Sequence, residues 1–170
     1  MDNFITTIGG KKELETRLDT LFTTSSQVDG EEASGDITGL IGQYAHGNEP
    51  SHHVAYLYSY AGHPEKTQQV IREVFDRFYL AKPDGLCGND DCGQMSAWYI
   101  FTAMGFYPVC PGSDQYVLGA PYLKEMTVHL ENGKDLVIKA PKVSAKNRYV
   151  KSVKLNGQEY HNAYLTHQDI

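Results

Sequence analysis

The stretch PEKTQQVIREVFDRFYL, residues 64–80, carries the strongest secondary-structure signal in the chain. Its apolar residues recur at the spacing of one face of an α-helix. The proline at its start suits a first helical position, because that N–H needs no partner inside the helix. We therefore predict a helix over residues 64–80 with a broad apolar face. That face consists of Val70, Ile71, Val74, Phe75, Phe78 and Tyr79.

Three further helices are predicted around this one. Residues 52–61 place aromatic and aliphatic side chains at helical spacing and end at Gly62, which turns the chain into the next helix. Residues 11–24 and residues 94–104 show the same periodicity. Residues 25–47 are rich in glycine, serine and acidic residues, which predicts a long loop of the kind that often has a function.

After residue 105 the periodicity changes to two, which is typical of strands. The turn sequences at residues 131–134 and 156–157 predict hairpins, and hence a small antiparallel β-sheet. The fold class is α+β, with a helical part over residues 1–110 that carries the motifs described below and strands over residues 111–170. The predicted strands are residues 116–118, 126–130, 136–140, 149–155 and 160–165.

Composition excludes several classes of function. The chain has 170 residues, 15 basic against 21 acidic side chains and a net charge of −6, without a dense basic run, so no nucleic-acid partner is expected. No stretch approaches the roughly 20 apolar residues that span a bilayer, and the first residues do not resemble a signal peptide. Three cysteines allow at most one internal disulfide and do not identify a compartment.

Two motifs flank the helix of residues 64–80. The first motif is HGNEPSHH, residues 46–53, and the second is GNDDCGQMSAWY, residues 88–99. Both place titratable or metal-binding side chains between glycines, which permit sharp turns. Because crowding such groups at a turn is costly, the two motifs indicate a functional site.

Each motif also has a purely structural explanation. Asp91 and Gln94 have the spacing of a capping box at a helix N-terminus. Pro50 at a first helical position would make Asn48 or Glu49 a cap. Each explanation accounts for one residue of its motif and leaves the others without a role.

A metal site is one function that the donor atoms allow. Oxygen donors outnumber nitrogen and sulfur donors, which favours a hard cation such as calcium. A zinc site from His52, Cys87 and Cys92 is the weaker alternative, because the two cysteines have no second paired motif. The oxygen donors are Asn48, Glu49, Asn89, Asp90 and Asp91.

Carboxylates from two turns, together with imidazoles and aromatic rings, suit recognition of a polyol and acid–base hydrolysis. Glycoside cleavage with inversion needs one carboxylate that activates water and a second carboxylic acid roughly 6.5–9.5 Å away that protonates the leaving oxygen. The two motifs offer candidates for these roles.

At these residues the chain resembles a known family. The first motif, residues 83–99 and GFYPV at residues 105–109 are similar to the C-terminal part of the calcium-dependent exo-α-mannosidases of glycoside hydrolase family 92. The similarity runs from about residue 4 to the end. It implies a protein with an N-terminal β-sandwich, an (α/α)6 barrel of six helical hairpins, and terminal strands. The helices of this chain would form part of that barrel.

The resemblance also implies a reaction and roles for residues. The reaction is inverting hydrolysis of α-linked mannose, usually α-1,2, with calcium holding the 2- and 3-hydroxyls of the sugar and easing distortion of its ring. Asp91 would be the base that activates water, with Asn89 or Asp90 assisting. The sugar-binding set would be His46, Glu49 and His53, and the calcium-binding set Asn48, Glu49 and Asn89.

The chain departs from the family in one respect. Family members are several hundred residues long, and their general acid is a glutamate in an aromatic-rich motif upstream. Residues 1–45 contain no such motif, and Glu31 and Glu32 lie in a polar loop. The resemblance therefore implies a fragment that holds the base and part of the calcium site, and that has no useful mannosidase activity alone.

Partners and location follow from the same comparison. The expected partners are a mannose-containing glycan and the missing N-terminal part of the protein, and the parent would be periplasmic or secreted. Helices that normally close a barrel would leave an apolar face uncovered, which favours self-association. The alternatives are a non-catalytic carbohydrate-binding or interaction module whose sugar affinity does not depend on calcium, and a zinc-structured domain.

Overall fold

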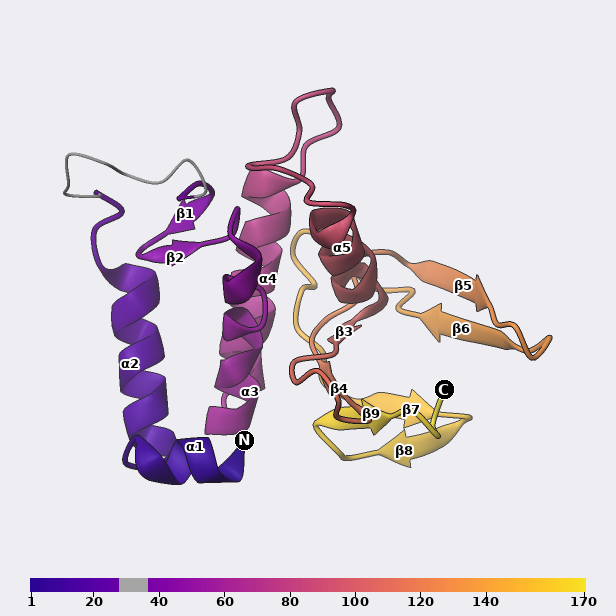
Figure 1. Cartoon of the computed structure of the whole chain (residues 1–170). Helices are drawn as coiled ribbons and strands as arrows, with labels where there is room; N and C mark the ends of the chain where they lie inside the picture. Colours follow the sequence, from indigo (N-terminus) through magenta and orange to yellow (C-terminus); the bar gives the residue numbers. More distant parts are fainter. Residues whose placement is uncertain (28–36) are drawn as a thin grey trace.

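The structure is a computed structural model that describes residues 1–27 and 37–170 (Figure 1). The helices are α1 (Asp2–Thr7), α2 (Lys11–Thr23), α3 (Leu57–Ala61), α4 (Pro64–Phe78) and α5 (Gln94–Met104), with 3-10 turns at Glu49–Ser51 and Val54–Tyr56. The strands are β1 (Leu40–Ile41), β2 (Tyr44–Ala45), β3 (Phe106–Tyr107), β4 (Gln115–Leu118), β5 (Glu125–His129), β6 (Asp135–Lys139), β7 (Val153–Leu155), β8 (Gln158–Tyr160) and β9 (Tyr164–Thr166). Helices α1 to α5 precede three small antiparallel sheets, as the prediction of helices first and strands last requires, and one short hairpin, β1–β2, lies between α2 and α3.

Helices α3 and α4 form the hairpin that the sequence predicts. Gly62 ends α3 in the left-handed region, at φ 96°, and the N–H groups of Gly62 and His63 bond back to carbonyl oxygens of α3. Pro64 then opens α4, which runs to Phe78, two residues short of its predicted end. The two helices pack side by side and bury Ile71, Val74 and Phe75 in the main core (Figure 1).

The prediction of one helix over residues 52–61 is wrong in its first half. Two 3-10 turns lead into α3, which begins only at Leu57. The N–H of Tyr56 bonds to the carbonyl of His53, which is the spacing of a 3-10 turn, and the carbonyl of His52 accepts a hydrogen bond from the indole of Trp98. A contact with a residue 46 positions along the chain therefore accompanies the departure from the local pattern.

The predicted loop over residues 25–47 also contains structure. Strands β1 and β2 form a short antiparallel hairpin in which Ile41 faces Tyr44, and both side chains are buried. Residues 28–36 of that predicted loop, with Glu31 and Glu32, lie outside the described residues.

The strand-rich part forms three sheets instead of the single predicted one. The sheets have the orders β3-β4-β9, β5-β6 and β7-β8, all antiparallel. The β7–β8 hairpin turns at Asn156 and Gly157, both with positive φ, as the sequence predicts. Strand β3 lies before residue 111 and pairs with β4, and the division of the chain at residue 110 stays a prediction.

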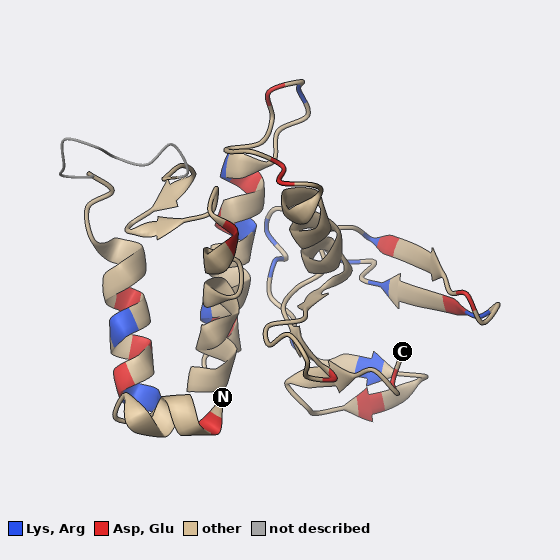
Figure 2. Ribbon diagram, viewed as in Figure 1, with Lys and Arg blue, Asp and Glu red and all other residues tan. Residues whose placement is uncertain are grey.

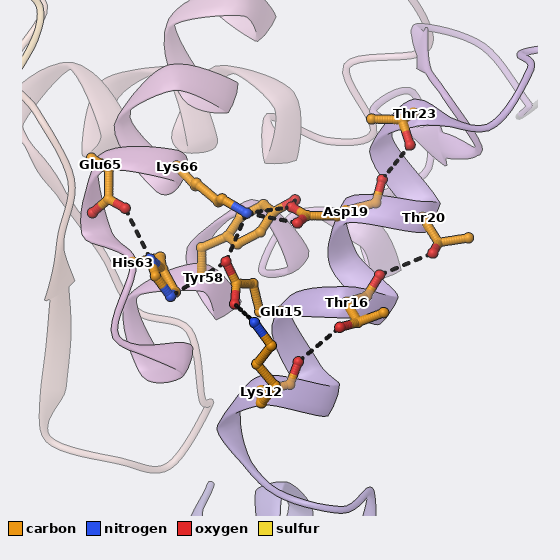
Figure 3. Close-up of polar contacts among 10 residues, drawn as sticks. All are labelled: Lys12, Glu15, Thr16, Asp19, Thr20, Thr23, Tyr58, His63, Glu65 and Lys66. Atoms are coloured by element: carbon orange, nitrogen blue, oxygen red, sulfur yellow. Dashed lines mark hydrogen bonds and ion pairs between the residues drawn. The ribbon is translucent and has the colours of Figure 1, made fainter.

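Helix α2 is attached to the α3–α4 hairpin by a polar cluster (Figure 3). Lys66 of α4 donates to Glu15 at 2.9 Å and to Asp19 at 2.7 Å, and Tyr58 of α3 donates to Asp19 at 2.9 Å. The ring of His63 lies between the carboxylates of Glu15 and Glu65. Hydrogen bonding to Asp19 raises the pKa of Lys66, because the charged form is the one that the cluster stabilises.

The outer surface of the helical part carries both signs of charge. Acidic and basic residues alternate along α2 and α4 (Figure 2). Among residues 1–27 and 37–170, no helix has the length and apolarity needed to cross a bilayer.

A group of apolar side chains lies exposed beside α5. Leu80, Leu86 and Ile100 line an open hollow of about 450 Å³ together with Tyr99. Self-association through such a surface stays a prediction: light scattering of the purified chain is expected to give a mass above that of one 19.0 kDa chain. A monomer without dye-accessible apolar surface would contradict it.

Candidate active site

The two motifs lie against each other, as a shared site requires. Besides its bond from the indole N–H of Trp98, at 3.1 Å, His52 interacts with Gln94 of the second motif. The Gln94 amide lies 3.3 Å from Nδ1 of His52, and Nε2 of His52 lies 3.0 Å from the carbonyl oxygen of His46. A carbonyl can only accept, so Nε2 of the neutral His52 ring carries the hydrogen and Nδ1 accepts from Gln94.

His46 is fully buried, and protein groups occupy both of its ring nitrogens. Tyr79 donates its hydroxyl hydrogen to the carbonyl of Met95 at 2.9 Å. The oxygen of Tyr79, 2.8 Å from Nε2 of His46, must therefore accept from Nε2–H. Nδ1 of His46 then accepts from the hydroxyl of Tyr44, also at 2.8 Å. Each hydrogen in this chain of bonds has one consistent position, which holds the ring in a single tautomer.

Burial keeps these imidazoles neutral. Desolvation, with a smaller contribution from the neighbouring His52, lowers the pKa of His46 to about 3. Desolvation also lowers the pKa of His52. The two rings stack with centroids 4.7 Å apart, and Trp98 packs edge-on to His46 at 4.4 Å. The interior face of the first motif is therefore an aromatic, uncharged support.

The other predicted residues of the first motif are closer to solvent. Asn48, Glu49 and His53 are partly exposed, and Asn48 precedes the 3-10 turn without capping it through its side chain. A sugar contact from His46 stays a prediction, and both ring nitrogens of His46 already have protein partners. Of the predicted site residues in this motif, Asn48, Glu49 and His53 are the ones that a ligand could reach.

The second motif enters α5 through an unusual turn. Asp91, Cys92 and Gly93 all have positive φ, at 52°, 56° and 96°. A non-glycine residue in this region costs of order 1–3 kcal/mol, and such residues occur both in tight turns, as at Asn156, and in clusters at functional sites. Asn89 supports the turn, because its side-chain oxygen accepts the N–H of Asp91 at 3.1 Å.

The predicted capping box is wrong. Gly93 occupies the N-cap of α5, and the side chain of Gln94 points to His52 instead of back to Asp91. Asp90 serves the helix terminus, because one of its carboxylate oxygens accepts the N–H of Ser96 at 3.0 Å and its hydroxyl at 2.8 Å. Because of the left-handed turn, the carboxylate that accepts from the helix N-terminus belongs to Asp90 and not to Asp91, the residue that the sequence pattern indicates.

The Asp90 contact predicts a measurable stability effect. Changing Asp90→Ala removes an acceptor for an N-terminal amide of α5, which should lower the free energy of unfolding by about 1 kcal/mol. Urea unfolding of the purified chain measures this difference. Asp90→Asn keeps an acceptor oxygen and should recover most of the loss, whereas an equal loss in both variants would contradict the capping role.

The side chain of Asp91 is exposed and, within residues 1–27 and 37–170, has no hydrogen-bond partner. Figure 2 marks acidic residues on the segment that leads into α5, at the open end of the helix. The structure thus separates three neighbouring residues: Asn89 shapes the turn, Asp90 caps the helix and Asp91 faces solvent.

The structure does not assemble the zinc site that the sequence left open. Both ring nitrogens of His52 bond to protein groups, and Cys92 is exposed. In the part of the chain that the structure describes, no three His, Cys, Asp or Glu side chains gather closely enough to hold a metal. The zinc hypothesis was wrong because sequence spacing does not reveal which donors the fold already uses.

Some supporting residues were not identified from the sequence. Tyr44 and Tyr79 belong to neither motif, and Gln94 was given a capping role. Tyrosines are common packing residues, so nothing local distinguishes these two. Only their convergence on His46 shows what they do.

Comparison with known proteins identifies the family. The model of the glycosyl hydrolase family 92 catalytic domain matches residues 1–170. The chain belongs to glycoside hydrolase family 92. The family resemblance that the motifs indicated is thereby confirmed, and the chain corresponds to part of the catalytic domain of this family.

Solved family 92 structures share this fold. An α-mannosidase from Bacteroides thetaiotaomicron, in complex with mannoimidazole, is 52% identical with a TM-score of 0.89, over 95% of this chain and 21% of that chain. An inverting mannosidase from Bacteroides thetaiotaomicron VPI-5482 is 42% identical with a TM-score of 0.78, over 96% of this chain and 23% of that chain.

A fungal relative is more distant. A protein of Arthroderma benhamiae named as an uncharacterized secreted glycosidase is 30% identical over 125 residues, which cover 72% of this chain and 16% of the relative. This chain therefore spans about a fifth of the length of the two bacterial enzymes and less of the fungal one.

Proposed function

We propose that this chain forms part of an exo-α-mannosidase that removes terminal α-linked mannose, with α-1,2 as the proposed linkage, from glycans by calcium-assisted inverting hydrolysis. The observation that carries the proposal is the second motif: an exposed carboxylate on a turn with positive φ, which has no partner among the described residues, beside a buried aromatic support. A family of α-mannosidases supplies the reaction class.

Asp91 is the proposed general base. Its carboxylate takes a proton from a water molecule as that water attacks the anomeric carbon from the face opposite the leaving oxygen. Asn89 and Asp90 assist by holding the turn, through the bonds to the N–H of Asp91 and to Ser96. Glu49 and His53 are the proposed sugar contacts. His46 is proposed to support this motif from the interior, because its ring stacks on the ring of His52.

The donor set fits calcium in part. Asn48 and Asn89 can bind a cation through their carboxamide oxygens and Glu49 through its carboxylate, the donors that calcium prefers, and the fold brings their two segments together. When bound, calcium would supply positive charge that orients sugar hydroxyls and eases ring distortion. Six to eight oxygens are needed, so we propose that the sugar, water and other parts of the catalytic domain complete the shell.

The remaining parts of the active site are proposed to lie elsewhere in the protein, because this chain spans about a fifth of the length of the two bacterial enzymes. The general acid is proposed to come from the rest of the catalytic domain, because residues 1–45 contain no glutamate in the aromatic-rich motif that the family resemblance implies. The helices α2 to α5 would then be one section of an (α/α)6 barrel. The parent is proposed to be periplasmic or secreted, in line with the name of the fungal relative.

A segment exchange tests the function. Residues 1–170 replace the matching segment of the 52% identical Bacteroides α-mannosidase, and mannose release from α-1,2-mannobiose is measured. We expect an active chimera that first releases the anomer of inverted configuration, as seen by NMR, and no activity from the 170-residue chain alone. A folded but inactive chimera, or retention of configuration, would contradict the proposal.

Calcium dependence is tested on the same chimera. Removing metal with EDTA should lower mannose release by at least about tenfold, because substrate positioning is lost. Added calcium should restore the rate. Unchanged activity after EDTA, or restoration by zinc but not by calcium, would contradict the calcium assignment.

A further inference from the structure

The base of the β1–β2 hairpin extends into the first motif. Beyond the two strands, the N–H of His46 donates to the carbonyl of Gly39 and the N–H of Gly47 donates to that of Thr38, both at 3.0 Å. Thr38 and Gly47 therefore lie side by side at the open end of the hairpin. Thr38 belongs to neither motif.

One glycine from each motif meets at this point. A Cβ placed on Gly88 would lie 3.1 Å from Cα of Gly47 and 3.3 Å from its carbonyl oxygen. The segments are thus in backbone contact, two residues before Glu49 and three before Asp91. Neither Gly47 nor Gly88 has a positive φ, so close approach, and not backbone conformation, requires glycine here.

The side chain of Thr38 packs on both glycines. Its Oγ1 would be 1.9 Å from a Cβ on Gly47 and 3.0 Å from a Cβ on Gly88. The hydroxyl is buried, and within the described residues it has no hydrogen-bond partner. Among these residues, Thr38 therefore meets the two glycines through the volume of its side chain.

We propose that Thr38 is a positioning residue for the active site. By filling the space over Gly47 and Gly88, it sets the separation between the turn that carries Glu49 and the turn that carries Asp91. The catalytic role of this separation rests on the proposed function. The packing of Thr38 on the two glycines does not depend on that function.

A size exchange tests the contact in the 170-residue chain. Trp98 is the only tryptophan, and its indole N–H bonds to His52 across the two motifs, so one NMR signal reports their juxtaposition. Gly47→Ala should shift that signal and lower Tm, because the new methyl group overlaps Oγ1 of Thr38. Adding Thr38→Ala removes the overlapping atom and should return the signal and much of the Tm.

Two controls separate this role from general packing. Gly119→Ala also adds a methyl group without a positive φ, but its closest neighbour is the side-chain tip of Ile71 at 2.9 Å, so Thr38→Ala should not rescue it. Thr38→Val keeps the shape and loses the hydroxyl, and it should preserve both the signal and Tm. Failure of the Gly47 rescue, or loss of the native signal in Thr38→Val, would overturn the proposal.

The chimera connects the contact to catalysis. Gly47→Ala should lower kcat by at least about tenfold, since small displacements of catalytic groups are costly, and the double variant should recover most of that loss. If the native chimera is inactive, the proposed function fails while the indole result still decides the contact. If the chimera is active and the double variant is not rescued, the positioning role fails.

Discussion

Asp91→Asn in the segment-exchange chimera is expected to lower kcat for α-1,2-mannobiose by about 10²–10⁴-fold, the range typical for loss of a general base. The amide cannot take the proton from the attacking water. KM should change little, because Asp91 faces the water and the direct sugar contacts are assigned to Glu49 and His53. Steady-state kinetics at saturating calcium measure both constants.

Asp84→Asn provides the matched control. It makes the same carboxylate-to-amide change in the exposed segment between α4 and α5, where Asp84 lies 3.3 Å from Lys82. We expect the rate of this variant to stay within about twofold of the native chimera, because surface ion pairs contribute little. Equal losses in both variants would mean that net charge, not a base at Asp91, controls the rate.

The second large effect concerns stability in acid. The folded-state pKa of His46, about 3, is below the ordinary 6.5 of the unfolded chain. Between these values the unfolded state binds more protons, so stability rises with pH and is lost as pH falls below 6.5. The free energy of unfolding should fall by about 1–2 kcal/mol between pH 6.5 and 5, with His52 acting in the same direction.

Urea unfolding at several pH values between 5 and 7.5 measures this dependence. His46→Gln should lower stability at pH 7.5 by about 2–4 kcal/mol, because it disrupts the bonds to Tyr44 and Tyr79, and should reduce the slope with pH. The control His129→Gln lies on the exposed β5–β6 hairpin and should leave stability at pH 7.5 nearly unchanged, because its contact with Asp135 is on the surface. Identical slopes in native chain and His46→Gln would exclude His46 as the acid-sensitive group.

Local periodicity predicted the elements whose own residues decide their structure. Helix α4 has a continuous apolar face and a proline start, and the β7–β8 hairpin has Asn156 and Gly157 at its turn, so the helix and the turn formed as expected. The strands beside this turn are Val153–Leu155 and Gln158–Tyr160, whereas the predicted strands were residues 149–155 and 160–165. Residues 52–56 were mispredicted because their structure involves residues far along the chain, among them Trp98, which donates to the carbonyl of His52. Neither helix propensity nor spacing contains that information.

In the candidate site too, the sequence predicted some features, and others depended on the fold. The two motifs were apparent from their density of polar groups and glycines, and the structure brings them together. The division of labour among Asn89, Asp90 and Asp91 was not predictable, because it depends on three successive residues in the left-handed region. Thr38 was also missed, since a threonine in a polar stretch has no distinguishing pattern until Gly47 and Gly88 are seen beneath it.

The meeting of Gly47 and Gly88 also has a kinetic consequence. Helices α3 and α4 adjoin in sequence and can dock early, whereas the two glycines close a loop of about forty residues that contains this hairpin. If the contact between Gly47 and Gly88 forms after the transition state for folding, substitutions at these glycines will accelerate unfolding and leave the folding rate nearly unchanged. The contact that aligns the two turns would then set how long the folded chain persists.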